Sequence, residues 1–287
     1  MNHKAGVAAP YNQDAESAEH PRGFLTPEDS ALGQRFLRDG YVIQPADDTD
    51  ALQQIRASVV TQAAEHLGIT DPGDEDAFLN TIHERVTVAD LNAMRLAVYN
   101  GVNAAPWLRE AYFGLARQSI EALVGNELAM QRRVNLSVQL PNDDSSLLPV
   151  HADVWSGDSP FEIVVWLPLV DCRKTKSMYL LPPGPDRAVS GRLQEFASRS
   201  AEDLFRAIEP DVEWIDIQFG QVLLFAQSLM HGNRINLEPD TRWSMNCRFK
   251  SLFSPYADKR LGEFFEPITV RAATRLGMDY KLPGGFA

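Results

Sequence analysis

The spacing of apolar residues changes once along this chain, from a helical period to an alternating one. In the first half, apolar side chains recur every three to four residues in three stretches, each followed by a glycine: Thr26–Asp39, Asp50–Leu67 and Pro106–Val124. The first stretch opens with Thr-Pro, a typical helix start, and glycine is typical of the residue just after a helix. We therefore expect three amphipathic helices, with a short strand at Tyr41–Ile43 after the first.

After Gly125 the period becomes two. Arg133–Leu140 alternates polar and apolar residues without a fault, which predicts a half-buried strand. Further short strands are expected at Phe161–Leu167, Met178–Leu181, Val212–Ile217, Val222–Phe225 and Trp243–Phe249. Helices followed by many short strands favour a mainly β fold with N-terminal helices, namely a double-stranded β-helix (a cupin-like jelly roll).

The organisation that we expect is one domain of residues 23–287 behind a flexible tail of residues 1–22. Residues 23–130 would form the helical support and residues 131–267 the jelly-roll core. A single unit of this length is common among β-barrels and sandwiches. The tail lacks the apolar segment of a secretion signal, and the longest apolar stretch, Ile163–Val170, is too short to cross a bilayer.

The composition of the chain limits the kinds of partner and substrate that we expect. The formal net charge of −12 argues against nucleic acid as a partner and against docking on anionic membranes, and it is compatible with a neutral or cationic small-molecule substrate. Only two cysteines occur, Cys172 and Cys247, and their setting suggests no disulfide framework. We therefore expect a cytoplasmic protein.

Three residues in the β-rich half have the chemistry of a metal site. His151 and Asp153 are two positions apart, so on a strand their side chains would point the same way. His231 follows the apolar strand Val222–Phe225, where the end of a strand can direct a ligand inward. Two imidazoles and one carboxylate with open positions beside them are typical of non-haem iron(II) oxygenases. The three residues are our predicted iron ligands.

An arginine opens the last predicted strand. Arg242 and Ser244 share one face of it with Asn246 and Arg248. An arginine on the inward face of a small barrel is energetically unfavourable unless an anion meets it. We expect Arg242 to bind the far carboxylate of 2-oxoglutarate in a bidentate pair, assisted by the Ser244 hydroxyl. The alternative is that this face is solvated.

The sequence resembles a known family in the same places. The segments that carry the likeness are His151–Glu162, Trp166–Leu169, Thr175–Pro182, His231–Asn236 and Thr241–Lys250. They are similar to the 2-oxoglutarate/iron(II) dioxygenases of carbohydrate-biosynthesis clusters, distant relatives of the phytanoyl-CoA hydroxylase superfamily. The resemblance implies iron at His151, Asp153 and His231, 2-oxoglutarate at Arg242, and O2 and a sugar-containing small molecule as co-reactants. Leu181–Pro185 departs from the glycine-rich stretch that the superfamily has there.

Three further residues are weaker candidates for the cosubstrate site. Asn135 and Gln139 lie on one face of the strand before His151, and they would either hydrogen-bond 2-oxoglutarate or form a wet outer face. Lys176 would assist the distal carboxylate or remain an ordinary surface lysine.

Two other functions fit the same residues. One is a cupin-type sugar isomerase or lyase that uses its metal as a Lewis acid without O2, with Arg242 holding the carboxylate of the substrate. The other is a carbohydrate-binding jelly roll without catalysis, in which the histidines merely pack.

Overall fold

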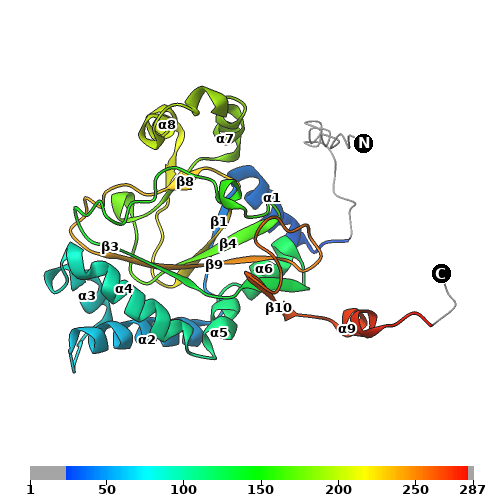
Figure 1. Cartoon of the computed structure of the whole chain (residues 1–287), viewed down its shortest axis with the longest axis horizontal. Helices are drawn as coiled ribbons and strands as arrows, with labels where there is room; N and C mark the ends of the chain where they lie inside the picture. The colour runs from blue at the N-terminus through cyan, green and yellow to red at the C-terminus, as the bar shows by residue number, and fades with distance from the viewer. Residues whose placement is uncertain (1–23, 284–287) are drawn as a thin grey trace.

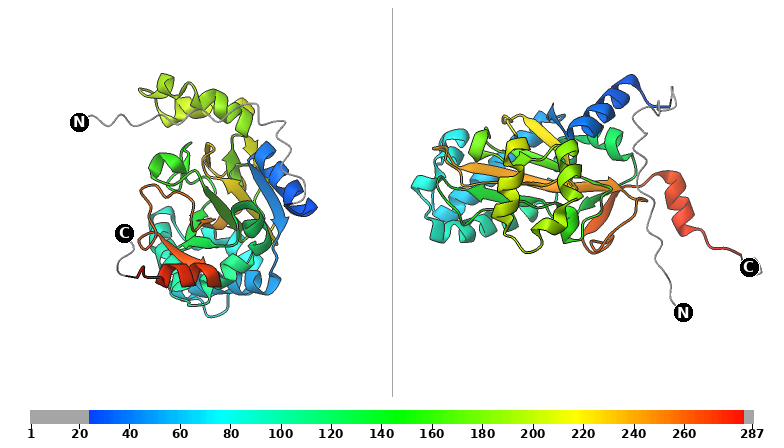
Figure 2. Two further views of the ribbon diagram at one scale, coloured as in Figure 1. Left: turned by 90° about the vertical axis from the view of Figure 1, so that its right-hand side faces the viewer. Right: turned by 90° about the horizontal axis from the view of Figure 1, so that it is seen from above.

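The computed structural model describes residues 24–283, and the predicted tail of residues 1–22 lies outside them. Within this part the helices are α1 (Pro27–Asp39), α2 (Thr49–Leu67), α3 (Glu75–Asn80), α4 (Val88–Asn103), α5 (Leu108–Gly114), α6 (Arg117–Val124), α7 (Pro183–Ser190), α8 (Ala201–Ile208) and α9 (Ala272–Asp279). None of these helices is long and apolar enough to cross a membrane. Helix α9 projects from the body of the protein (Figure 1, Figure 2).

The first two predicted helices form, with the expected ends. The Thr26 side chain accepts a hydrogen bond from the backbone N–H of Asp29 at 3.0 Å, and Gly40 ends α1 in the left-handed region at φ 80°. The third prediction, one helix over Pro106–Val124, is wrong. The chain breaks between α5 and α6 because Asp47 binds both sides of the break: its N–H donates to the Leu115 carbonyl, and its carboxylate accepts from the Gln118 N–H.

The strands form two antiparallel sheets. The larger sheet has the order β1 (Tyr41–Pro45), β7 (Gln221–Ala226), β4 (Glu162–Pro168), β9 (Arg242–Ser251), β2 (Leu128–Gln131) and β10 (Phe265–Thr269), with β3 (Asn135–Gln139) also paired to β9. The smaller sheet has the order β6 (Glu213–Trp214), β5 (Tyr179–Leu180) and β8 (His231–Gly232). The six strands predicted after Gly125 all have counterparts, whereas β2, β8 and β10 were not predicted.

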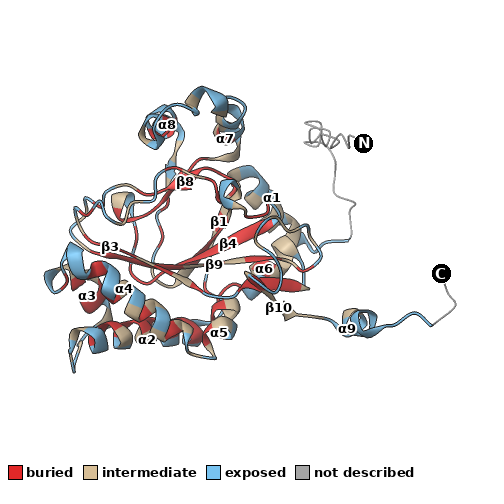
Figure 3. Ribbon diagram, viewed as in Figure 1, coloured by how far each residue is buried: buried red, intermediate tan, exposed pale blue. Residues whose placement is uncertain are grey.

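Helices α2 to α5 cover one face of the larger sheet, and β8 lies on its other side (Figure 1). The core between helices and sheet is buried, as Figure 3 shows. Strand β9 divides its side chains between the two faces as its alternation predicts. Trp243, Met245, Cys247 and Phe249 are all at most 1% exposed in the core. Their neighbours Arg242, Ser244, Asn246 and Arg248 line a cavity on the opposite face.

Trp243 links β9 to the helical layer and gives a stability prediction. Its side chain is fully buried, and its indole N–H donates to the Leu79 carbonyl at 2.9 Å. Trp243→Phe should lower the free energy of unfolding by about 2–3 kcal/mol, because it leaves a small cavity and an unpaired carbonyl. Chemical denaturation measures the change. Trp155→Phe, at a side chain 46% exposed, is the control and should change the free energy by less than about 0.5 kcal/mol. Equal effects would contradict this account of the core.

Candidate metal centre

Three predicted ligands, far apart in sequence, meet at one place. His231 lies in β8, and His151 pairs with it through two backbone hydrogen bonds of 3.0 and 2.8 Å. The Asp153 N–H donates to the Gln227 carbonyl at 3.0 Å, which holds Asp153 beside them. One ligand atom from each of His151, Asp153 and His231 lies within 4.8 Å of the other two. This arrangement suits a single metal ion.

The local backbone differs from the strand that was expected. His151 forms only an isolated bridge, and Asp153 is the first residue of a 3₁₀ helix, Asp153–Ser156. The two side chains still converge, because Ala152 between them is extended (φ −117°, ψ 135°) and so directs His151 and Asp153 to the same side, as on a strand. The prediction that His151 and Asp153 lie together is therefore confirmed, although no full strand forms there.

Backbone carbonyls orient both imidazoles. Nδ1 of His151 lies 2.8 Å from the Pro149 carbonyl, and Nδ1 of His231 lies 2.8 Å from the Leu229 carbonyl. A carbonyl only accepts, so each Nδ1 carries the hydrogen and each Nε2 keeps its lone pair. The two Nε2 atoms lie 3.4 and 3.7 Å from Oδ1 of Asp153. Both lone pairs and one carboxylate oxygen are therefore available to one cation.

Arg248 fixes the carboxylate of Asp153. It donates to Oδ2 of Asp153 at 2.6 Å, and its Nε donates to Oε1 of Gln227 at 2.9 Å. Oδ2 is thus occupied, whereas Oδ1 faces the imidazoles. Arg248 was predicted to lie on the same face of the strand as Arg242, but no role was predicted for it. The alternation along β9 was the available signal.

The protonation states suit a metal site. Burial, helped by the nearby His151, lowers the pKa of His231 to about 4. Burial also acts to lower the pKa of His151, but hydrogen bonds to Asp153 and to the Pro149 carbonyl outweigh it and raise the pKa above its ordinary 6.5. Burial acts to raise the pKa of Asp153, yet His151 and Arg248 lower it well below its usual range. Asp153 is a carboxylate at neutral pH.

The raised pKa of His151 predicts how metal affinity depends on pH. A protonated imidazole cannot bind a metal, so protons compete with the metal below the pKa of His151, which lies above 6.5. The Fe(II) affinity of the protein should be constant at high pH and should fall about tenfold per pH unit below that pKa. Anaerobic titrations between about pH 6 and about pH 9 measure this. An affinity that rises as the pH falls would contradict the assignment.

Arg248→Gln tests the support of the carboxylate. The substitution removes the charged donor that holds Oδ2 of Asp153, so Fe(II) affinity should fall by about 10- to 100-fold, as for other residues that hold a metal ligand in place. Anaerobic metal titration is the measurement. Arg206→Gln, at an exposed arginine of α8, should leave the affinity unchanged. An Arg248 variant with the affinity of the wild type would show that Asp153 needs no such support.

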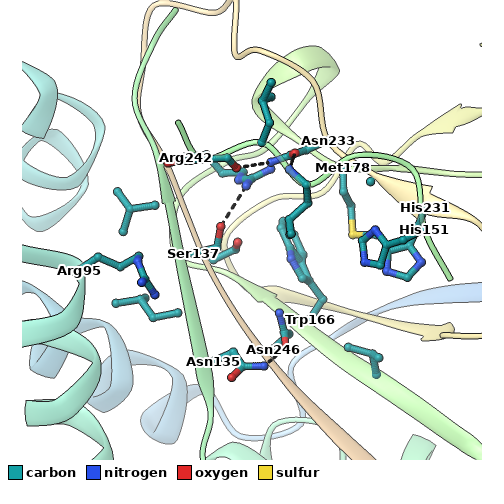
Figure 4. A pocket seen from close by; sticks show the side chains of 18 of the residues that line it. Arg95, Asn135, Ser137, His151, Trp166, Met178, His231, Asn233, Arg242 and Asn246 are labelled. Atoms are coloured by element: carbon teal, nitrogen blue, oxygen red, sulfur yellow. Dashed lines mark hydrogen bonds between the residues drawn. The ribbon is translucent and has the colours of Figure 1, made fainter. Parts of the chain in front are cut away.

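A second feature of the same cavity is a buried arginine without a counter-charge. Arg242 is 3% exposed; its guanidinium donates to the Ser137 hydroxyl at 3.0 Å, as Figure 4 shows, and also to the Ser177 carbonyl at 3.3 Å. Within residues 24–283, no carboxylate lies within salt-bridge distance of it. Burial lowers its pKa to about 10, so it stays charged at neutral pH. A buried cation in this state needs an anion.

Three buried polar atoms around this guanidinium have no hydrogen-bond partner: Nε of Arg242, Oγ of Ser244 and Oγ of Ser177. Buried polar groups are nearly always paired in native proteins. Arg242 and Ser244 line the cavity, whereas Ser177 does not, so the unbalanced charge and the unpaired Ser244 hydroxyl together form an anion recess that an acceptor-rich anion would satisfy. Ser177 was not among the predicted residues. Its position beside Arg242 depends on β5, which sequence spacing does not place relative to β9.

The other three residues predicted for the cosubstrate site have different surroundings from Arg242. Asn135 lines the cavity, although its amide already donates to Asn246 at 2.9 Å. Gln139 is fully buried and donates to the Arg234 carbonyl, and it does not line the cavity. Lys176 is buried as well, bonded to Asn80 at 2.6 Å and outside the cavity lining. We therefore remove Gln139 and Lys176 from the expected cosubstrate site, because their polar groups serve other contacts. The alternative that Lys176 is a surface lysine is also wrong.

The cavity that joins these features has a volume of about 880 Å³. His151, Asp153 and His231 line it, as do Arg242, Ser244 and Arg248. In Figure 4 the two histidines and Arg242 stand on either side of Trp166. The volume lies in the range of small-molecule sites. A metal, a small dianion and a substrate therefore have room in one cavity.

No protein-family model and no curated protein matches the chain. Solved structures do match. The nickel complex of the non-haem monooxygenase ThoJ is 17% identical, with 85% of each chain covered and a TM-score of 0.53. The α-ketoglutarate-dependent carbocyclase SnoK from nogalamycin biosynthesis is 17% identical, with 86% of this chain and 97% of that chain covered and a TM-score of 0.52. HygX from Streptomyces hygroscopicus, with nickel and 2-oxoglutarate bound, is 14% identical over 83% and 90% of the chains, with a TM-score of 0.50. The chain shares the fold of non-haem oxygenases.

Proposed function

We propose that this protein is a non-haem iron(II)- and 2-oxoglutarate-dependent oxygenase. Residues 23–287 would form one domain, in which the larger and smaller sheets make up a double-stranded β-helix. The observation that carries the proposal is that a two-histidine, one-carboxylate cluster and a buried, uncompensated Arg242 line one cavity. Either feature alone would be compatible with several kinds of protein. Together, the cluster would bind an iron(II) ion, and the anion recess at Arg242 would bind the far carboxylate of 2-oxoglutarate.

The donor set fits Fe(II). Nε2 of His151 and of His231 and Oδ1 of Asp153 would hold the ion, and Arg248 keeps the second Asp153 oxygen occupied. When bound, iron with 2-oxoglutarate supplies the reduction of O2: one oxygen atom enters the succinate formed with CO2, and the other enters a substrate C–H bond. The chain itself supplies the binding and the orientation of these components.

Arg242 would position 2-oxoglutarate. Its guanidinium offers a planar donor pair to the far carboxylate, with the Ser244 hydroxyl as a further donor. Binding would balance the buried charge of Arg242 and give partners to its Nε and to the Ser244 hydroxyl, both of which are unpaired without a ligand. The opposite, keto-acid end of the cosubstrate would then extend toward the histidines.

For the substrate, we propose a sugar or a sugar-containing small molecule that is hydroxylated. The support is the resemblance of the sequence to dioxygenases of carbohydrate clusters, together with the lining of the cavity. The cavity is lined by several amide and hydroxyl side chains and two aromatic rings, which suit the hydroxyls and the ring face of a sugar: Asn92, Ser145, Asn233, Asn246, Tyr99 and Trp166.

The test is anaerobic reconstitution with Fe(II) and 2-oxoglutarate. We expect a visible charge-transfer absorption band from the protein that carries both, and formation of succinate once air is admitted. The proposal fails if purified wild-type protein gives neither the band nor succinate. Turnover of a sugar without O2 would instead favour the Lewis-acid isomerase or lyase. A protein that binds sugar without any metal would favour the binding module.

A further inference from the structure

Helix α4 forms one wall of the cavity. One side of it is buried in the core through Leu91, Met94, Val98 and Val102. A second side lines the cavity with residues at helical spacing: Val88, Asn92, Arg95, Leu96 and Tyr99. The Asn103 amide donates to the Val134 carbonyl, and its oxygen accepts from the Val134 N–H, so the helix is fixed to the segment before β3. The cavity wall is therefore a firmly attached helix.

Arg95 is the one basic residue on that side of α4. Its side chain is directed toward the strand that carries Asn135 and Ser137 (Figure 4). Its one hydrogen bond is to the amide oxygen of Asn92, at 2.8 Å. Among the residues that the structure describes, no carboxylate forms an ion pair with Arg95. A cavity-lining guanidinium with only a neutral partner retains most of its donors for a ligand.

The charges of the cavity lining do not balance. Four cationic side chains line it (Arg95, Arg242, Arg248 and Lys259) against two carboxylates (Asp153 and Asp158). Arg248 pairs with both carboxylates, and Lys259 pairs with Asp158. The guanidinium groups without a carboxylate are those of Arg95 and Arg242. The cavity lining is thus basic, although the chain has a net charge of −12.

The two arginines without a carboxylate partner differ in burial and in the element that carries them. Arg242 is almost completely buried in β9, where the orphan serine hydroxyls adjoin it, whereas Arg95 is partly exposed on α4. Under the proposed function, 2-oxoglutarate satisfies Arg242 and leaves Arg95 unmatched. Arg95 therefore keeps donors free for a second anion, and the substrate is the remaining component of the reaction.

We propose that the substrate carries an anionic group, a carboxylate or a phosphate, which binds the guanidinium of Arg95 with the Asn92 amide beside it. That the anion belongs to a substrate rests on the proposed function, but the anion site itself rests on α4 alone. The group would lie at the α4 side of the cavity, away from the histidines, so it would anchor the substrate rather than react. Arg95 is in this sense a specificity residue.

The experiment uses inorganic phosphate and acetate as separate probes. Wild-type protein, loaded anaerobically with Fe(II) and saturating 2-oxoglutarate, is titrated with each anion at constant ionic strength, and binding is followed by ligand-detected NMR. We expect saturable binding of at least one anion, and the tighter of the two identifies the group. Arg95→Gln should weaken that binding about tenfold or more, because it removes a charge-assisted pair. Arg35→Gln, at an exposed arginine of α1 outside the cavity, should leave it unchanged.

Three results would overturn the inference. The first is that neither anion binds the wild type saturably. The second is that Arg95→Gln binds the anion as tightly as the wild type does. The third is that anion binding is lost in Arg242→Met and retained in Arg95→Gln, which would place the anion on Arg242. The charge-transfer band, recorded before any anion is added, reports the proposed function separately. Absence of the band with Arg95-dependent anion binding would reject the oxygenase and retain the anion site.

Discussion

Arg242→Met is expected to abolish measurable binding of 2-oxoglutarate while leaving the folded protein at least as stable as the wild type. Arg242 is buried with an unpaired Nε and without a carboxylate, so the metal- and ligand-free protein bears an uncompensated charge. An apolar side chain of similar length removes that charge, and replacing buried charges in this way is often neutral or stabilising. The same change removes the donor pair for the distal carboxylate, a loss of about 2–5 kcal/mol.

Two measurements on one variant test this prediction. Thermal unfolding without ligand should show no loss of stability, and added 2-oxoglutarate should raise the midpoint of the wild type but not of Arg242→Met, because a ligand stabilises only the protein that binds it. Lys176→Met, at another buried cation outside the cavity, is the control and should keep the ligand-induced rise. A destabilised Arg242→Met that still responds to 2-oxoglutarate would mean that Arg242 has a structural role instead.

His231→Ala is expected to remove Fe(II) binding and, with it, all turnover of 2-oxoglutarate. His231 is buried, and its Nδ1 is hydrogen-bonded to the Leu229 carbonyl. Burial lowers its pKa to about 4, so the imidazole is neutral and the lone pair of Nε2 is free to bind a metal. Loss of a ligand should exceed the 10- to 100-fold effect of losing a group that supports one, so we expect a decrease above about 100-fold.

The decrease is measured by anaerobic Fe(II) titration and by succinate formation. His66→Ala, at an exposed histidine of α2, is the matched control and should behave as the wild type. The result against the prediction is an His231→Ala protein that still binds one equivalent of Fe(II) with an affinity near that of the wild type.

The metal cluster was predictable because its residues stand at points that strand patterns define. His151 and Asp153 are two positions apart in sequence, and His231 follows the apolar β7, so each of the three stands where the strand pattern indicates. Arg242 and Ser244 followed from the alternation along β9, which the structure confirms. The same alternation contained Arg248. A residue that binds another residue's carboxylate has no spacing signal of its own.

The helical wall of the cavity was not predictable in the same way. Helix α4 presents apolar residues on two sides, such as Met94 to the core and Leu96 to the cavity, so it has no simple amphipathic period. The pattern therefore predicted no helix there, and Arg95 could not be placed. Gln139 and Lys176 failed for a related reason: their partners, the Arg234 carbonyl and Asn80, lie far away in sequence.

Short buried segments were the other part of the fold that the sequence pattern did not predict. Strand β2 is buried at all four residues, so it shows no alternation. Helices α7 and α8 lie between β5 and β6, where no element was predicted, and Asp186 of α7 accepts a hydrogen bond from the Met230 N–H beside His231. The pattern of the sequence thus predicted residues that line the cavity better than it predicted the segments that hold them.

The most direct test of the account is a crystal structure of the protein grown without O2 in the presence of Fe(II) and 2-oxoglutarate. We predict an anomalous iron signal in contact with Nε2 of His151, Nε2 of His231 and Oδ1 of Asp153, with the distal carboxylate of 2-oxoglutarate paired to Arg242. Iron bound elsewhere, or 2-oxoglutarate bound with its distal carboxylate away from Arg242, would contradict it.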